Sequence, residues 1–174
     1  MTLLALFLLG WVLALDRASV GAEETKVTGT LTSQPEGSLS LKTDATSYGL
    51  VGGLDFRPYI GKTVTLAGGV KGGTLYVGAL TLGTVHVENQ KGIVRVFTAG
   101  TVERTADSYQ VTVEGIAFQL TGSQELDQVV GKFANIEGML TGTEVALTSL
   151  RTADGKEISL QAPEVPPLPT PKPD

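Results

Sequence analysis

The sequence predicts an all-β protein built from two tandem copies of one small five-stranded unit. The first observation is a pattern, L-x-G, eight residues, then G-K-x-x-x-x-x-G, that occurs twice at a constant spacing of 70 residues. Its residues are Leu50, Gly52, Gly61, Lys62 and Gly68 in the first copy and Leu120, Gly122, Gly131, Lys132 and Gly138 in the second. The second observation is a series of short runs in which apolar and polar residues alternate, a pattern typical of strands. Because matching internal copies imply matching folds, both copies are expected to adopt one fold.

The alternating runs place the expected strands in the same order in both copies. In the first copy they cover 26–33, 38–42, 46–51, 62–70 and 74–81, and in the second 94–104, 109–114, 116–121, 132–140 and 144–150. The segments 54–60 and 124–130 lack alternation and suit one short helical turn each. A glycine follows each turn, Gly61 or Gly131, as expected where a helical turn ends in a left-handed residue.

The element order resembles that of a known fold. The first expected strand ends in G-T-[LV], at Gly29-Thr30-Leu31 and Gly100-Thr101-Val102, and G-K leads into a strand with a central glycine. With the L-x-G turn and the short helix, this arrangement resembles small exported bacterial OB-fold domains over nearly all of 26–150. The resemblance implies two tandem five-stranded OB-like β-barrels, each with a short helical turn between strands 3 and 4. It implies no catalytic residue, because this fold hosts many unrelated functions.

The two ends of the chain differ in composition from the repeats. Residues 3–15 form an uncharged apolar run that is too short to span a bilayer, so we expect 1–22 to be a signal peptide cleaved before Glu23. An uncleaved N-terminal anchor is the alternative and would be the protein's only membrane contact. Residues 161–174 are rich in proline and are expected to form a disordered tail.

These ends and the repeats divide the chain into five segments. We expect the first barrel over 23–85, a linker at 86–93 and the second barrel over 94–160. The protein is therefore expected to be exported, to the periplasm, the cell surface or the medium. The chain has no cysteine, which excludes disulfides and a lipid-modified cysteine, and its formal net charge of -5 argues against sequence-independent nucleic-acid binding.

Strand alternation indicates which side chains a ligand could reach. Ten residues are expected to point inward: Leu39, Leu41, Tyr48, Leu50, Tyr109, Val111, Val113, Ile116, Phe118 and Leu120. The polar residues between them form the candidate ligand-binding set: Ser38, Ser40, Lys42, Ser47, Gln110, Thr112 and Gln119. This set suits a small molecule or an oligosaccharide. Because it contains no aromatic residue on which bases could stack, single-stranded nucleic acid is only a third alternative.

The sequence offers no constellation for catalysis or metal binding. It has a single histidine, His86, in the expected linker, whereas a metal site needs several convergent ligands. The acidic residues Asp55, Glu125 and Asp127 fall on the expected helical turns, where exposure makes general acid–base work a poor fit. We therefore predict no catalytic residue, metal or cofactor, and enzyme activity ranks with nucleic-acid binding as a third alternative.

Four apolar residues fall on the outward side of their expected strands: Tyr76, Phe97, Phe133 and Met139. Apolar side chains on the outside of a strand need another protein surface to cover them. The favoured interpretation is that they join the two barrels, since small barrels need extra burial, and the alternative is a partner site. The sequence thus predicts an exported, non-catalytic binding or assembly module of the bacterial cell envelope that contacts a protein partner, with small-molecule or oligosaccharide binding as the alternative.

Overall fold

The computed structural model describes residues 24–122 and 125–158. The expected signal peptide, 1–22, and the expected proline-rich tail, 161–174, lie outside these residues. Within the described ranges, no helix is long and apolar enough to cross a membrane.

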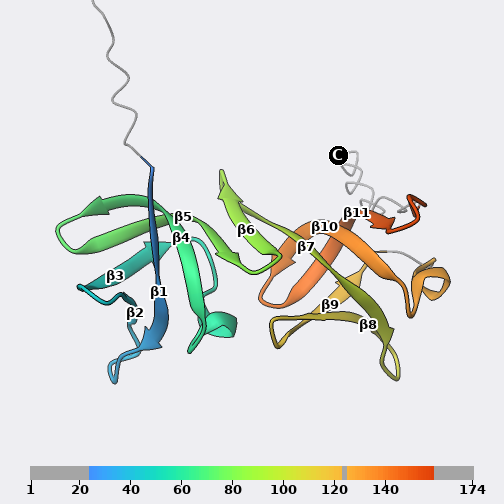
Figure 1. Ribbon diagram of the computed structural model, residues 1–174, viewed down its shortest axis with the longest axis horizontal. Coiled ribbons are helices and arrows are strands. Elements are labelled where there is room, and N and C mark those ends of the chain that lie inside the picture. The colour runs from blue at the N-terminus through green and yellow to red at the C-terminus, as the bar shows by residue number, and fades with distance from the viewer. Residues whose placement is uncertain (1–23, 123–124, 159–174) are drawn as a thin grey trace, which may run out of the picture.

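The described part of the protein is all-β, and its eleven strands form one sheet (Figure 1). The first repeat contains β1 (Thr25–Ser33), β2 (Leu39–Lys42), β3 (Ser47–Gly52), β4 (Thr63–Lys71) and β5 (Thr74–Leu82). The second contains β7 (Ile93–Arg104), β8 (Tyr109–Val113), β9 (Ile116–Thr121), β10 (Phe133–Thr141) and β11 (Glu144–Thr152). Two short 3-10 helices, η1 (Arg57–Tyr59) and η2 (Leu126–Val129), lie between the third and fourth strands of the repeats. All ten expected strands and both helical turns are confirmed.

Within each repeat the strands pair in a closed circuit. β1 pairs antiparallel with β2 and β4, β2 pairs with β3, β3 pairs parallel with β5, and β5 pairs back with β4. The second repeat has the same circuit, with β7, β8, β9, β11 and β10 in these places. The register shifts at Gly68 in β4 and at Gly138 in β10, where a Cβ would collide with the carbonyl group of the neighbouring strand. The two mid-strand glycines therefore allow the irregular pairing of each fourth strand.

The segment expected to be a linker, 86–93, contains most of an additional strand, β6 (Val85–Gln90). β6 pairs antiparallel with β5 of the first repeat and with β7 of the second, so it merges the two circuits into one sheet. Its side chains alternate: Val85 and Val87 are 0% and 2% exposed, whereas His86 and Glu88 face the other side and are half-buried. The connection between the repeats is thus a shared strand.

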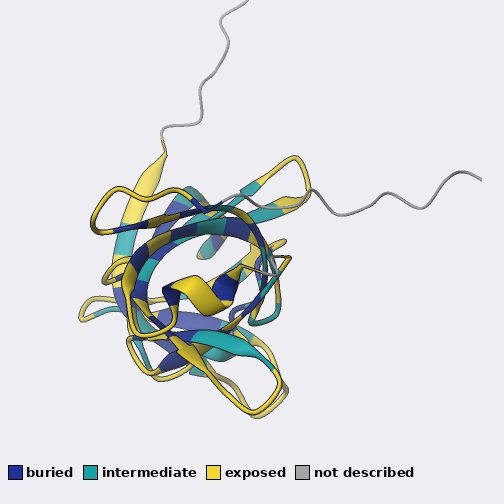
Figure 2. Cartoon of the chain, turned by 90° about the vertical axis from the view of Figure 1, so that its right-hand side faces the viewer, coloured by how far each residue is buried: buried dark blue, intermediate teal, exposed yellow. Residues whose placement is uncertain are grey.

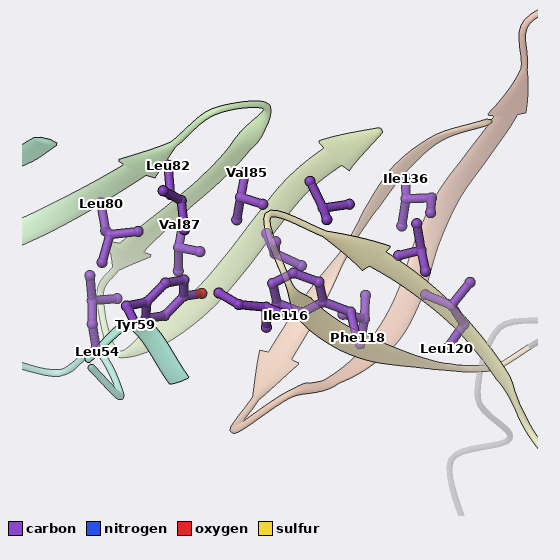
Figure 3. Close-up of a cluster of buried hydrophobic side chains, with 14 of the residues drawn as sticks. Leu54, Tyr59, Leu80, Leu82, Val85, Val87, Ile116, Phe118, Leu120 and Ile136 are labelled. Atoms are coloured by element: carbon purple, nitrogen blue, oxygen red, sulfur yellow. The ribbon is translucent and has the colours of Figure 1, made fainter. Parts of the chain in front are cut away.

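The buried apolar side chains form one cluster that includes residues of both repeats. Figure 3 shows part of it, from Leu54 and Tyr59 of the first repeat, past Val85 and Val87 of β6, to Phe118 of the second. Figure 2 shows the buried residues lining the inside of the curved strands of the second repeat, with η2 across the middle of the view. All ten side chains expected to point inward are buried or half-buried.

Candidate functional site

The face of the sheet opposite the shared core runs without interruption across the junction of the repeats. Strand register places His86 beside Thr81 of β5 and Phe97 of β7, Phe97 beside Glu137 of β10, and Glu137 beside Ser149 of β11. These five side chains form one row across five strands. We call this side of β5, β6, β7, β10 and β11 the junction face.

Phe97 lies at the centre of the junction face and is held by its neighbours. The guanidinium carbon of Arg95, two residues earlier on β7, lies 5.2 Å from the ring centroid, within the range of a cation–π contact. Arg95 also forms an ion pair with Glu137 across the strand pair. On the other side, the imidazole of His86 lies 6.2 Å from the Phe97 ring, centroid to centroid. These contacts fix the ring in the centre of the face.

A hollow of about 590 Å³ opens beside Phe97, over Ala99. Its polar rim consists of Thr84, His86, Asn135, Glu137, Ser149 and Arg151. Asn135 stands opposite Ala99 in the β7–β10 pairing, and Arg151 stands opposite Asn135 in the β10–β11 pairing. Because the Ala99 side chain is small, the molecular surface over Ala99 lies closer to the backbone of the sheet than the surface over Phe97.

An apolar flank lies on the opposite side of Phe97, toward the β6–β7 turn. Ile93 and Met139 are 54% and 43% exposed and lie on either side of Arg95, since Met139 is its cross-strand neighbour and Ile93 precedes it by two residues. A hollow of about 520 Å³ is lined by these three residues and by Gln90, Lys91, Glu137, Thr148 and Ser149. We call Ile93, Arg95 and Met139 the apolar flank.

The junction face also extends into the first repeat. A hollow of about 460 Å³ there is lined by Glu24, Lys26, Thr65, Ala67, Ala79, Thr81, His86 and Glu88. His86 belongs to both this hollow and the one over Ala99. Its Nδ1 lies 3.0 Å from the hydroxyl of Thr81, and its Nε2 lies 4.0 Å from the carboxylate of Glu88. The lone histidine of the chain therefore lies where the two repeats meet on this face, next to Glu88, which pairs with Ala79 of the first repeat and Arg95 of the second.

The seven polar residues of the candidate ligand-binding set lie apart from the junction face. Ser38, Lys42, Ser47, Thr112 and Gln119 are exposed, and Gln110 is half-buried and donates from Nε2 to Glu103. Ser40, in contrast, is 6% exposed, because Thr32 and Gln34 cover it and hydrogen-bond its hydroxyl at 2.8 and 3.1 Å. The prediction that Ser40 is available to a ligand is wrong. The others lie on or beside two separate hairpins, β2–β3 and β8–β9, one in each repeat.

The outward apolar residues do not join the repeats as the favoured interpretation proposed. Tyr76 and Phe133 are each 51% exposed, and Met139 is also exposed. Phe97 is half-buried, against His86 of the shared strand. The interpretation is wrong for the three exposed residues because β6 and the buried cluster supply the contact between the repeats. Their role as a partner site stays a prediction.

Several titratable groups of the described residues form ion pairs, such as Asp55 with Arg57 and Arg104 with Asp127. In the described part of the chain, no group of three or more His, Asp or Glu side chains is placed to hold a metal ion. The Asp55 carboxylate accepts hydrogen bonds from the Arg57 side chain at 2.8 and 2.7 Å, which lowers the pKa of Asp55. A carboxylate held ionised in this way stabilises the start of η1 and is poorly suited to donate a proton.

Most residues of the junction face were missed because they meet through the pairing of β7 with β10 and β11, and because β6, which brings His86 beside Phe97, was expected to be a linker. Phe97 and Met139 were identified as outward apolar residues, but Ile93, Arg95 and Asn135 carry no sequence signal of their own. The signal that could have found the face is the alternation Val85-His86-Val87-Glu88, which is typical of a half-buried strand. Comparisons with protein-family models, curated proteins and solved structures found no match to the chain.

Proposed function

We propose that the protein is an exported, non-catalytic binding module of the bacterial cell envelope that docks a protein partner on the apolar flank. The observation that carries this proposal is the exposure of Ile93 and Met139 on neighbouring strands around Arg95. Exposed apolar side chains gathered at one place mark interaction sites more often than isolated ones do. Methionine and arginine are also enriched in protein–protein interfaces, whereas lysine and glutamate are depleted.

The geometry of the flank favours an anchoring side chain from the partner. Arg95 is held by Glu137 and Phe97, so its guanidinium loses little additional freedom on binding. The adjoining hollow of about 520 Å³ gives a partner's apolar side chain a place to insert. On binding, the inserted side chain and the flank would become a buried centre surrounded by polar residues, which is the usual form of an energetic hot spot.

The proposal includes the architecture and the location of the protein. The circuit of strand pairings in each repeat supports two five-stranded OB-like barrels, a fold whose strands carry binding functions in many contexts. Export rests on the apolar run at 3–15. The candidate polar residues lie on or beside two separate strand hairpins, one in each repeat, an arrangement that supports binding over catalysis.

Photo-crosslinking tests the proposal directly. A benzoylphenylalanine placed at Ile93 should capture one dominant envelope protein, and the same group placed at Val51, which is 50% exposed in the first repeat, should not. Replacing Met139 by Ser in the Ile93-labelled protein should abolish the capture, and replacing Tyr76 by Ser should leave it unchanged. Equal capture from both positions, or capture that persists after Met139→Ser, would overturn the assignment of the apolar flank.

A further inference from the structure

We propose that the hollow over Ala99 is a binding site for an uncharged saccharide unit, a ligand distinct from the protein partner proposed for the apolar flank. The site lies on the second repeat, on the Ala99 side of Phe97. Arg95, Phe97 and Ala99 point to the same face of β7, so the Phe97 ring stands between the apolar flank and this hollow. The two sites therefore share one wall and can be tested separately.

The walls of the hollow suit a ring that carries several hydroxyl groups. Asn135 offers a donor and an acceptor in one plane, Ser149 offers a hydroxyl, and Glu137 accepts. The Thr84 hydroxyl donates to the carbonyl of Ala99 at 3.5 Å and can still accept. Phe97 provides a flat apolar wall, against which the C–H face of a sugar ring can pack because the face of an aromatic ring is electron-rich. The volume of about 590 Å³ falls within the range of roughly 300–1,000 Å³ that holds small organic ligands.

The charges around the hollow are already compensated. Glu137 is paired with Arg95, and Arg151 lies 3.6 Å from the carboxylate of Glu157. An anionic ligand would compete with Glu157 for Arg151, and a cationic ligand would compete with Arg95 for Glu137; since both pairs are partly exposed, this competition carries a modest cost. A neutral, hydroxylated ligand binds without that cost.

The first repeat provides an internal comparison. Thr28 and Thr65 occupy the cross-strand positions that correspond to Ala99 and Asn135, and Lys26 occupies the position of Phe97. The hydroxyls of Thr28 and Thr65 lie 2.8 Å apart and hydrogen-bond to each other, so they satisfy one another in place of a ligand. The corresponding position of the first repeat also carries a hollow, of about 460 Å³, but there Thr65 is hydrogen-bonded to Thr28 and Lys26 replaces the flat wall of Phe97.

Calorimetric titration with cellohexaose, maltohexaose and chitohexaose, which are neutral, and with hexagalacturonate, which is acidic, tests the site. At least one neutral hexasaccharide should bind. Asn135→Ala should weaken the binding of that hexasaccharide about tenfold or more, because the hydroxyl groups of the sugar lose a bidentate hydrogen-bonding partner. Ala99→Leu should abolish binding by filling the hollow. Thr65→Ala, the matched change in the first repeat, and Ile93→Ser, in the apolar flank, should leave binding unchanged.

Both substituted side chains of the hollow point away from the core, and backbone amide spectra of each variant would verify that it is folded. Absence of binding by all three neutral hexasaccharides at concentrations up to about 10 mM would overturn the proposal, since specific ligands bind more tightly than that. Binding that survives Ala99→Leu would overturn the location. Tighter binding of hexagalacturonate would overturn the inference that the ligand is uncharged. If partner capture at Ile93 failed while a saccharide still bound, the protein docking proposed for the apolar flank would be overturned and the saccharide site would stand.

Discussion

The same position in the two repeats is filled by two different segments. In the first repeat, β6 lies along the last residues of β5, with Val85 beside Leu82 and Val87 beside Leu80. In the second, residues 156–158 lie along the last residues of β11, where Lys156 accepts from the amide of Thr152 and Ile158 donates to the carbonyl of Leu150. Val87 and Ile158 therefore correspond and are both buried, whereas buried Val85 corresponds to exposed Lys156.

This difference explains why the sheet continues from the first repeat into the second through β6. β6 presents apolar residues to a core that it shares with both repeats, and its second edge pairs with β7. Lys156 cannot extend such a core, and its ammonium group donates to Gln128 instead, at 2.9 Å. A second pair of positions also has an apolar residue at the junction and a polar one at the outer end: buried Ile116 lies at the junction, and the corresponding residue of the first repeat, Thr46, is exposed. Polar residues at the outer ends thus confine the continuous core to one junction.

The largest effect should come from placing a charge in the shared core. Val87→Asp buries an unpaired carboxylate between the repeats and should lower the free energy of unfolding by about 4 kcal/mol. Urea denaturation followed by circular dichroism measures the loss, and amide spectra show whether both repeats loosen together. Ile158→Asp, the matched change, should cost less because its segment pairs with β11 alone among the described strands. A loss confined to the first repeat in Val87→Asp would show that the core is not shared.

The second prediction concerns Tyr59, a titratable residue in η1 whose counterpart in η2, Val129, has no titratable group. Burial, with a smaller contribution from the Asp55 charge, raises the pKa of Tyr59 to about 12. An unfolded tyrosine has a pKa of about 10, so between pH ~10 and ~12 the unfolded chain releases a proton that the folded chain keeps. The free energy of unfolding should therefore fall with rising pH in this window, by about 2–3 kcal/mol in total, at 1.36 kcal/mol per pKa unit.

Tyr59→Phe is the control for this pH dependence. The Tyr59 hydroxyl is buried and has no hydrogen-bond partner among the described residues, so its removal should leave the protein equally stable or about 1 kcal/mol more stable at pH 7. The variant should also lose the decline above pH 10 in denaturation curves. An unchanged decline would mean that another group causes it.

A third, smaller effect should follow when the junction is made to resemble the outer end. Ile116→Thr introduces the residue found at the corresponding position 46 and should cost about 2 kcal/mol, through lost burial and a buried hydroxyl. Scanning calorimetry should then show broadened or separate transitions for the two repeats in place of one. Thr46→Ile, the reverse exchange, should change stability by less than about 0.5 kcal/mol because position 46 is exposed. A single sharp transition in Ile116→Thr would place the coupling elsewhere, in the β6 hydrogen bonds.

The repeats themselves could be predicted from sequence, whereas their junction could not. Period-two alternation identifies ten strands, and Gly61 and Gly131, both with φ near +80°, mark the ends of the two helical turns as expected. β6 was overlooked because it has no complete counterpart 70 residues away, so the repeat comparison treats it as a connection. Phe97 has a clear outward position in the sequence, but its contact with His86 requires β6 to be a strand, and its contact with Glu137 comes from β10, which is distant in the chain.

The smallest effect concerns the two lysines of the repeated G-K pattern. Lys62 reaches across the junction and donates from Nζ to the backbone carbonyl of Glu114 at 2.7 Å, whereas the corresponding Lys132 belongs to the outer end. Lys62→Ala should therefore lower the free energy of unfolding by about 0.5–1 kcal/mol, since the bond is exposed and water replaces part of it. Lys132→Ala should cost less than half of that. Equal losses in chemical denaturation of the two variants would mean that the G-K lysine supports its own repeat, and that the contact with Glu114 contributes nothing to holding the repeats together.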